Sequence, residues 1–222
     1  MHKNLTNLTI IEKQINDKIE GTLSDSKKIN IIAISKTFQM IDIKPLIDYG
    51  HMHFGENKVQ EALEKWNEIK NNYTDLKLHM VGKLQTNKVK FILPLFDYIH
   101  SLDNLKLAEK ISIEQKKKNF RPKIFIQVNI GNEIQKNGID KENLNRFLKI
   151  CQKDFDLDII GLMCIPPNND KVEEYFKEMN QLRLKHDLKE LSMGMSNDFK
   201  LAVQNQATFI RVGSKIFGPR NI

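Results

Sequence analysis

Short apolar runs alternate with segments of helical periodicity along the chain, and this alternation constrains the fold more than any other feature. The apolar runs predict strands at 31–35, 52–54, 78–81, 98–101, 124–130, 159–163, 191–193 and 209–212. Between them, apolar residues recur at three- and four-residue spacing, which predicts helices at 59–73, 105–116, 144–151 and 172–184. Strands that alternate with helices in this way form a parallel sheet covered by helices.

Eight such units in 222 residues fit a compact (β/α)₈ TIM barrel, although barrels of this kind usually use more chain. A doubly wound open sheet is the competing topology. Residues 1–24 are expected to form an additional amphipathic helix that packs on the barrel, with apolar positions at Leu5, Leu8, Ile11, Ile15 and Ile19. Because no linker-like segment divides the chain, residues 1–222 are expected to form one domain.

Composition narrows the class of protein. The two cysteines, Cys151 and Cys164, provide no disulfide framework, and the start of the chain lacks the apolar core of a signal peptide. We therefore expect a cytoplasmic protein, and no apolar stretch has the length of a membrane span. The net charge of +7 is typical of proteins that bind nucleic acid, but the lysines are interspersed with acidic residues and not with aromatic residues. We expect a monomer without nucleic-acid or membrane partners.

A lysine directly follows the first buried strand, in the segment Ile31-Ile32-Ala33-Ile34-Ser35-Lys36. Proteins with parallel sheets place their chemistry at this end of a strand. Burial there would lower the pKa of the Lys36 amine and make it a nucleophile for a Schiff base with a carbonyl compound such as pyridoxal phosphate. A lysine that merely ends the strand and points into water is the alternative, and this segment alone favours it.

Polar residues follow seven of the expected strands, as a barrel with a site at the carboxyl ends of its strands requires. The last two of these segments, Ser192-Met193-Gly194-Met195-Ser196 and Gly213-Ser214, offer hydroxyls and flexible glycines. TIM barrels commonly hold phosphate in the loops after strands seven and eight, so the barrel predicts a phosphate site here. Two ordinary glycine and serine turns are the alternative.

Arg211 lies on the last expected strand, between Ile210 and Val212, so its side chain points into the barrel. A buried guanidinium must be paired or hydrogen-bonded. It can donate to a ring nitrogen and keep that nitrogen unprotonated, or it can form a structural ion pair with an acid of the barrel. Periodicity alone leaves both alternatives open.

Six segments together resemble one family. They are Ala-Ile-Ser-Lys-Thr (33–37), Phe-Gly-Glu-Asn-Lys-Val-Gln-Glu (54–61), His-Met-Val-Gly-Lys-Leu-Gln-Thr-Asn-Lys (79–88), Gly-Leu-Met-Cys-Ile-Pro (161–166), Leu-Ser-Met-Gly-Met-Ser-Asn-Asp (191–198) and Ile-Arg-Val-Gly-Ser-Lys-Ile-Phe-Gly (210–218). From about residue 30 to the end, the chain resembles the YggS/PROSC family, the pyridoxal phosphate homeostasis proteins. The combination of motifs is highly specific.

The resemblance implies a TIM barrel like the N-terminal domain of alanine racemase, with pyridoxal 5′-phosphate (PLP) bound to Lys36. By the same resemblance, Ser196 binds the phosphate, helped by the turn at Gly213 and Ser214. Arg211 matches the arginine that contacts the pyridine nitrogen.

Three further residues match the family pattern more loosely. Asn57 matches the asparagine of the family's Gly-Glu-Asn motif near the cofactor, and Met163 is expected to pack on the ring. Lys136 corresponds to a lysine that implies a secondary PLP contact, but its flanking residues differ. Gly213-Ser214 replaces the more usual Gly-Thr and keeps the hydroxyl.

A carrier role is expected rather than catalysis. An arginine on the pyridine nitrogen weakens the ring as an electron sink. In alanine racemase a second domain helps to supply the opposite acid or base, and this chain stops at Ile222, so an open site is expected. The resemblance implies a carrier in PLP homeostasis that makes transient contact with PLP-dependent apoenzymes. A PLP-dependent enzyme with weak amino-acid racemase activity is the alternative.

Overall fold

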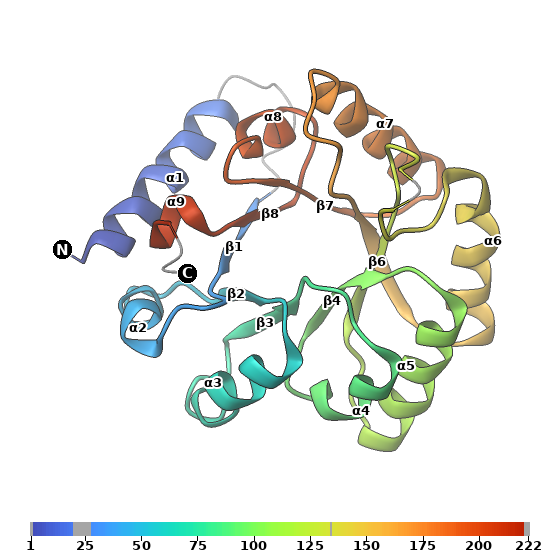
Figure 1. Ribbon diagram of the computed structural model, residues 1–222, viewed down its shortest axis with the longest axis horizontal. Helices are drawn as coiled ribbons and strands as arrows, with labels where there is room; N and C mark the ends of the chain where they lie inside the picture. Colours follow the sequence, from blue (N-terminus) through green and yellow to red (C-terminus); the bar gives the residue numbers. More distant parts are fainter. Residues whose placement is uncertain (1, 20–27, 134, 220–222) are drawn as a thin grey trace.

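Eight parallel strands close into a barrel in the order β1 to β8, with β8 hydrogen-bonded to β1 (Figure 1). The computed structural model describes residues 2–19, 28–133 and 135–219. The strands are β1 (Asn30–Ile34), β2 (His53–Glu56), β3 (Lys77–Met80), β4 (Tyr98–Leu102), β5 (Lys123–Gln127), β6 (Asp158–Met163), β7 (Glu190–Met195) and β8 (Phe209–Val212). Because β1 pairs with both β2 and β8, the predicted TIM barrel is confirmed and the open sheet is excluded.

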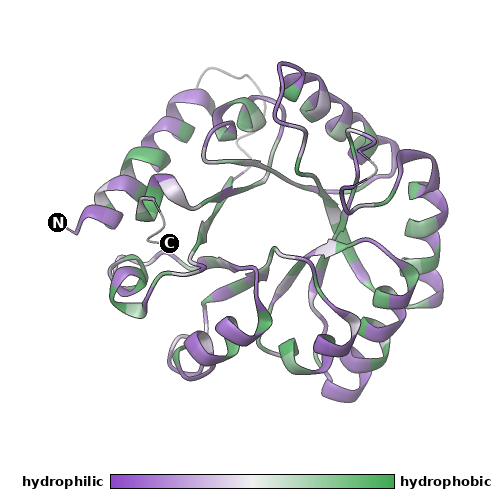
Figure 2. Cartoon of the chain, in the orientation of Figure 1, coloured by the Kyte–Doolittle hydropathy of each residue, from purple (hydrophilic) through white to green (hydrophobic). Residues whose placement is uncertain are grey.

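Helices surround the barrel. They are α1 (Lys3–Ile19), α2 (Met40–Asp48), α3 (Val59–Asn72), α4 (Val89–Ile92), α5 (Leu105–Lys118), α6 (Leu144–Lys149), α7 (Val172–Lys185), α8 (Phe199–Gln204) and α9 (Ser214–Phe217), with 3₁₀ turns η1 (Thr86–Lys88) and η2 (Lys141–Asn143) and a π turn η3 (Ile150–Asp154). Figure 2 shows helices that are mainly hydrophilic on their outer faces around mainly hydrophobic strands. In the described parts of the chain, no helix is long and apolar enough to cross a membrane.

Most predicted boundaries lie within two residues of the observed ones, but two elements differ more clearly. The fifth strand was predicted to reach residue 130 but ends at Gln127, because the backbone at Val128 then forms only an isolated bridge with Ile139. The helix predicted over 144–151 divides into α6 and the π turn η3. Both errors lie in segments whose apolar pattern continues past the regular element.

Helix α1 covers the part of the barrel where the first and last strands meet. It packs against α2, α8 and α9, and it buries Leu8, Ile11 and Ile15 (Figure 1). Asn7 Nδ2 also donates a 2.8 Å hydrogen bond to the carbonyl of Ile216 near the other end of the chain. Of the segment 1–24 predicted for this helix, residue 1 and residues 20–24 lie outside the described residues.

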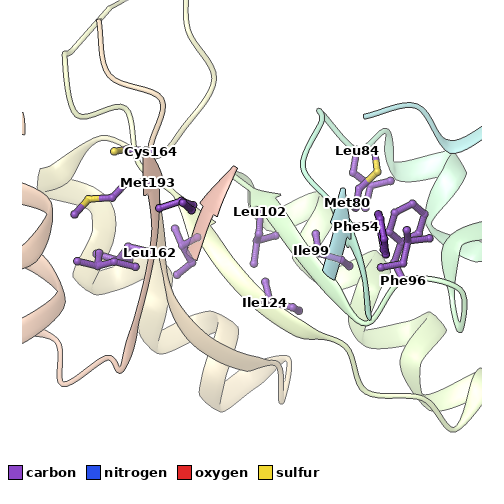
Figure 3. Close-up of a cluster of buried hydrophobic side chains, with 14 of the residues drawn as sticks. Phe54, Met80, Leu84, Phe96, Ile99, Leu102, Ile124, Leu162, Cys164 and Met193 are labelled. Carbon is purple, nitrogen blue, oxygen red and sulfur yellow. The ribbon is translucent and has the colours of Figure 1, made fainter. Parts of the chain in front are cut away.

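The apolar core has two layers. The larger one lies between the strands and the surrounding helices, and Figure 3 shows part of it, including Phe54, Phe96 and Cys164. The smaller one fills the barrel interior and consists of Ile32, Tyr98, Phe125, Met163 and Phe209. The interior is therefore packed with side chains, and a ligand site must lie above it, at one end of the barrel.

Candidate functional site

A cavity of about 610 Å³ lies at the carboxyl ends of the strands. Six of the residues predicted to hold the cofactor line it, namely Lys36, Asn57, Ser196, Arg211, Gly213 and Ser214. They come from the ends of β1, β2, β7 and β8, which the closed barrel brings around one mouth. The seventh, Met163, is fully buried in the interior layer of the core and does not line the cavity.

Lys36 is half-buried and lines the cavity two residues after β1 ends. It therefore does not simply point into bulk water, which was the alternative from the sequence. Thr37, the next residue, has a φ of 69°, in the left-handed region that β-branched residues rarely adopt. The backbone turns sharply at this point, directly beside the predicted nucleophile.

A buried carboxylate anchors the residue before Lys36. Glu56 is fully buried at the end of β2, and its Oε1 accepts a 2.8 Å hydrogen bond from the Ser35 hydroxyl. The same oxygen accepts from the indole nitrogen of Trp66 at 2.9 Å and from the Lys65 ammonium at 3.0 Å, both on α3. A buried charge is tolerated only when it is paired and hydrogen-bonded, and Glu56 meets this condition at Oε1 through Ser35 and α3, whereas its Oε2 has no hydrogen-bond partner among the described residues.

Lys65 also holds the backbone on both sides of Lys36. Its ammonium donates to the Ser35 carbonyl at 2.9 Å and to Glu61 Oε1 at 2.9 Å. Glu61 Oε1 in turn accepts from the Thr37 backbone N–H. Burial opposes ionisation of Glu61, but the hydrogen bonds from Lys65 and Thr37 lower the pKa of its carboxyl. We call Lys65, Glu56 and Glu61 the Lys65 clamp, since together they fix the chain on either side of Lys36.

Arg211 reaches the base of the cavity from β8, and its side chain is almost completely buried. Nη1 donates to the Ser192 hydroxyl at 2.7 Å and Nη2 to the Cys164 carbonyl at 2.8 Å. Within the described ranges no carboxylate forms an ion pair with it, so the ion pair considered from the sequence is not found there. Burial lowers the pKa of Arg211, and its charge is compensated by neutral acceptors.

Behind Arg211, a row of histidines crosses the barrel interior. The Ser192 hydroxyl lies 2.9 Å from His100 Nδ1, His100 Nε2 lies 2.9 Å from His79 Nδ1, and His79 Nε2 lies 2.9 Å from His53 Nδ1. Sequence reasoning missed this row. The available signal was a polar residue inside two apolar runs, as in Leu78-His79-Met80 and Ile99-His100-Ser101.

A turn of small and hydroxyl residues also lines the cavity. The Gly213 N–H donates to the Ser196 hydroxyl at 3.3 Å, and Ser214 begins α9, whose first N–H groups have no intrahelical acceptor. A Cβ on Gly213 would lie 3.3 Å from the Cβ of Ile34. Gly194 has a φ of 87°, so a glycine is required between the two serines of the other turn.

Asn57 and Lys136 differ in their relation to the cavity. Asn57 lines it, and its Oδ1 is buried without a hydrogen-bond partner among the described residues. Lys136 lies in the loop after β5, paired with Glu133 at 2.5 Å, and borders a separate polar hollow of about 470 Å³. The structure therefore brings Asn57 to the cavity and leaves Lys136 outside it.

Comparisons with a family model, with related sequences and with solved structures agree with one another. The family model described as "Alanine racemase, N-terminal domain" matches residues 17–221. The chain is 38% identical over 199 residues to the pyridoxal phosphate homeostasis protein of Aquifex aeolicus, covering 86% of each chain. It is 32% identical over 226 residues to the protein of the same name from Haemophilus influenzae, covering 97% of this chain and 95% of the relative.

Among solved structures, PipY of Synechococcus elongatus PCC7942 with PLP bound is 33% identical, with a TM-score of 0.78 over 92% of this chain and 100% of that chain. The same protein without PLP gives a TM-score of 0.81 over 93% and 99%. Alanine racemase from Clostridium difficile 630 is 13% identical and shares the fold alone, with a TM-score of 0.72 over 100% of this chain and 58% of that chain.

Proposed function

Because the chain belongs to the pyridoxal phosphate homeostasis protein family and carries the alanine racemase N-terminal domain, we propose that it binds PLP covalently on Lys36. Its role is that of a carrier or regulator in intracellular PLP homeostasis, without a dedicated catalytic reaction. The observation that carries the proposal is the cavity in which Lys36, Arg211 and the turn at Ser196 and Gly213 meet.

These residues match the three functional groups of PLP. The aldehyde of PLP condenses with a primary amine and releases water, and Lys36 offers that amine. Arg211 would donate to the ring nitrogen, and the Ser196 hydroxyl with the turn at Gly213 and Ser214 would receive the phosphate, since all four residues line the cavity. The buried Oδ1 of Asn57, which has no partner in the described chain, supports a polar ligand at the same place.

The role of Arg211 supports a carrier. A guanidinium does not give up its proton in proteins, so it acts only as a donor and disfavours protonation of the nitrogen it contacts. An unprotonated ring is a weaker electron sink. The relatives are named homeostasis proteins rather than enzymes, which agrees with this inference.

The two cysteines support a reducing compartment, and we infer the cytoplasm. Neither forms a disulfide, and burial raises the pKa of each thiol to about 12. Contacts with PLP-dependent apoenzymes, as recipients of the cofactor, belong to the same proposal.

The test is a spectrum followed by peptide mapping. Purified protein mixed with PLP is expected to become yellow, and borohydride followed by proteolysis is expected to place the label on Lys36. Lys36→Ala is expected to remove the label, whereas Lys83→Ala, a change at another lysine of the cavity, is expected to keep it. A wild-type protein that takes up no PLP, or a label on another lysine, would overturn the proposal. Conversion of L-alanine to D-alanine that depends on Lys36 would place the protein among enzymes instead.

A further inference from the structure

A continuous path of hydrogen bonds leads from the candidate PLP site through the centre of the barrel. It begins at Arg211 and passes through Ser192, His100 and His79 to His53, with donor–acceptor distances of 2.7, 2.9, 2.9 and 2.9 Å. We call the last four residues the histidine chain. Ser192, His79 and His100 are fully buried, and His53 is half-buried.

The arginine sets the direction of the whole path. Arg211 is a donor only, so the Ser192 oxygen accepts from it. In the described chain the Ser192 hydroxyl contacts only Arg211 and His100, so its proton is satisfied only when it donates to His100 Nδ1. Burial lowers the pKa of His79 and His100 well below the usual range, so both rings are neutral, with one donor and one acceptor nitrogen.

The protons of the three rings then follow one another. With Nδ1 as acceptor, His100 carries its proton on Nε2 and donates it to His79 Nδ1. His79 for the same reason donates from Nε2 to His53 Nδ1. Each ring therefore turns its acceptor side toward Arg211. Oriented dipoles of this kind stabilise a buried cation, and successive hydrogen bonds polarise one another in a low-dielectric interior.

Aromatic packing holds the rings in this arrangement. His79 stacks on Tyr98 with ring centroids 4.3 Å apart and an angle of 11° between the planes. His100 stacks on Phe125 with a centroid distance of 4.3 Å and an angle of 18°. Stacking fixes the plane of each ring, and the hydrogen bonds of the path determine which edge of the ring faces each partner.

We propose that the histidine chain positions Arg211 for the ring nitrogen of PLP and supplies the oriented dipoles that hold its charge at the base of the cavity. Ser192, His100, His79 and His53 are positioning residues that act through Arg211. The inference rests on the proposed function for the identity of the ligand. Its structural part, the single direction of the hydrogen bonds, concerns the protein alone.

The direction is tested without ligand. Nitrogen NMR of protein labelled with ¹⁵N-histidine distinguishes a protonated Nε2 from a protonated Nδ1. At pH 7 we expect His53, His79 and His100 to be neutral with the proton on Nε2. A proton on Nδ1 of His100, or a charged His100, would overturn the inference even if PLP binds on Lys36. Failure of the wild type to bind PLP would instead overturn the proposed function and leave this measurement intact.

The positioning role is tested by PLP binding. A hydrogen bond to a charged group contributes on the order of 1.5–3 kcal/mol, so Ser192→Ala is expected to weaken PLP binding roughly 10-fold to 150-fold. Ser192→Thr restores the hydroxyl and is expected to recover most of the affinity.

A second variant breaks the path at a distance from Arg211. His79→Phe keeps a ring against Tyr98 but removes both hydrogen bonds, so we expect weaker PLP binding and a mixed proton position on His100. Tyr98→Phe preserves the same stack and the whole path, and is expected to bind PLP like the wild type. A folded His79→Phe protein with unchanged PLP affinity and an unchanged His100 proton would refute the positioning role.

Discussion

The Lys65 clamp predicts a large loss of stability from one substitution, Lys65→Met. Methionine keeps most of the length and apolar character of the lysine stem but removes the ammonium. That ammonium contacts three oxygens at 2.9–3.0 Å, on Ser35, Glu56 and Glu61. The Lys65 side chain is 11% exposed and that of Glu56 is 0% exposed, so solvent cannot replace the lost partner at Glu56.

The expected magnitude follows from this burial. Removal of one partner of a buried ion pair typically costs about 3–5 kcal/mol, because the other charge is left uncompensated. Since urea lowers the free energy of unfolding by roughly 1–3 kcal/mol per molar, with large chains near the upper end, the midpoint is expected to fall by about 1–2 M. Glu56→Gln in the Lys65→Met background removes the stranded charge and is expected to recover part of the loss.

The assay is equilibrium unfolding in urea of the wild type, both single variants and the double variant. Lys177→Met is the matched control, because Lys177 pairs with Glu173 at 2.8 Å on a helix surface where both side chains are about half exposed. Exposed pairs contribute about 0–1 kcal/mol. If Lys65→Met unfolds at the same urea concentration as this control, the clamp does not stabilise the loop that carries Lys36.

Three further predictions concern stability. Burial lowers the pKa of His51 and His53 to about 4 and that of His79 and His100 well below the usual value. Since their unfolded forms take up protons near pH 6.5, each of these four side chains is expected to lower the free energy of unfolding by up to about 1.4 kcal/mol per pH unit as the pH falls from 6.5 to 4.5, with full stability retained above 6.5. Urea titrations across this range that show no loss of stability would contradict their neutral state. Gly194→Ala is expected to lower the thermal midpoint of unfolding clearly more than Gly50→Ala. Both glycines have a positive φ, but only at Gly194 would the new Cβ lie 2.5 Å from the Cβ of Ala202. Equal shifts of the midpoint would refute the steric part of this argument. Leu8→Ala on α1 is expected to lower the free energy of unfolding in urea by about 2–5 kcal/mol, because Leu8 is fully buried. Ile10→Ala, at a half-exposed position of the same helix, is expected to lower it much less. Equal losses would show that α1 is not packed as described.

The alternation of apolar runs and helical segments predicted a parallel sheet, because strands buried on both faces read as continuous apolar runs. It left a closed barrel and an open sheet as alternatives, and the family resemblance favoured the barrel. The alternation was sufficient to bring Lys36 and Arg211 to one end, since each lies at the carboxyl end of a strand and parallel strands align those ends. The predicted end of the fifth strand was wrong, because apolar residues continue past the sheet at Val128.

The supporting residues could not be predicted in the same way. Lys65 lies on a helix, and periodicity does not distinguish a lysine that reaches back to a strand end from one in solvent. The row of histidines depends on the register of neighbouring strands, which a single sequence does not specify. Met163 was expected at the ring of PLP, and its burial in the interior layer follows from the same unknown register.

The position of the candidate site on the barrel has a consequence for how the molecule opens. Lys36 follows β1 and Arg211 lies on β8, the two strands whose pairing closes the barrel and joins the most distant parts of the sequence. Contacts between such distant segments carry a high entropic cost during folding. A ligand held by both residues would link β1 to β8 across the pairing that closes the barrel. It would slow separation of β1 from β8 more than a ligand of equal affinity held within one βα unit, and it would make the loaded protein more resistant to proteolysis.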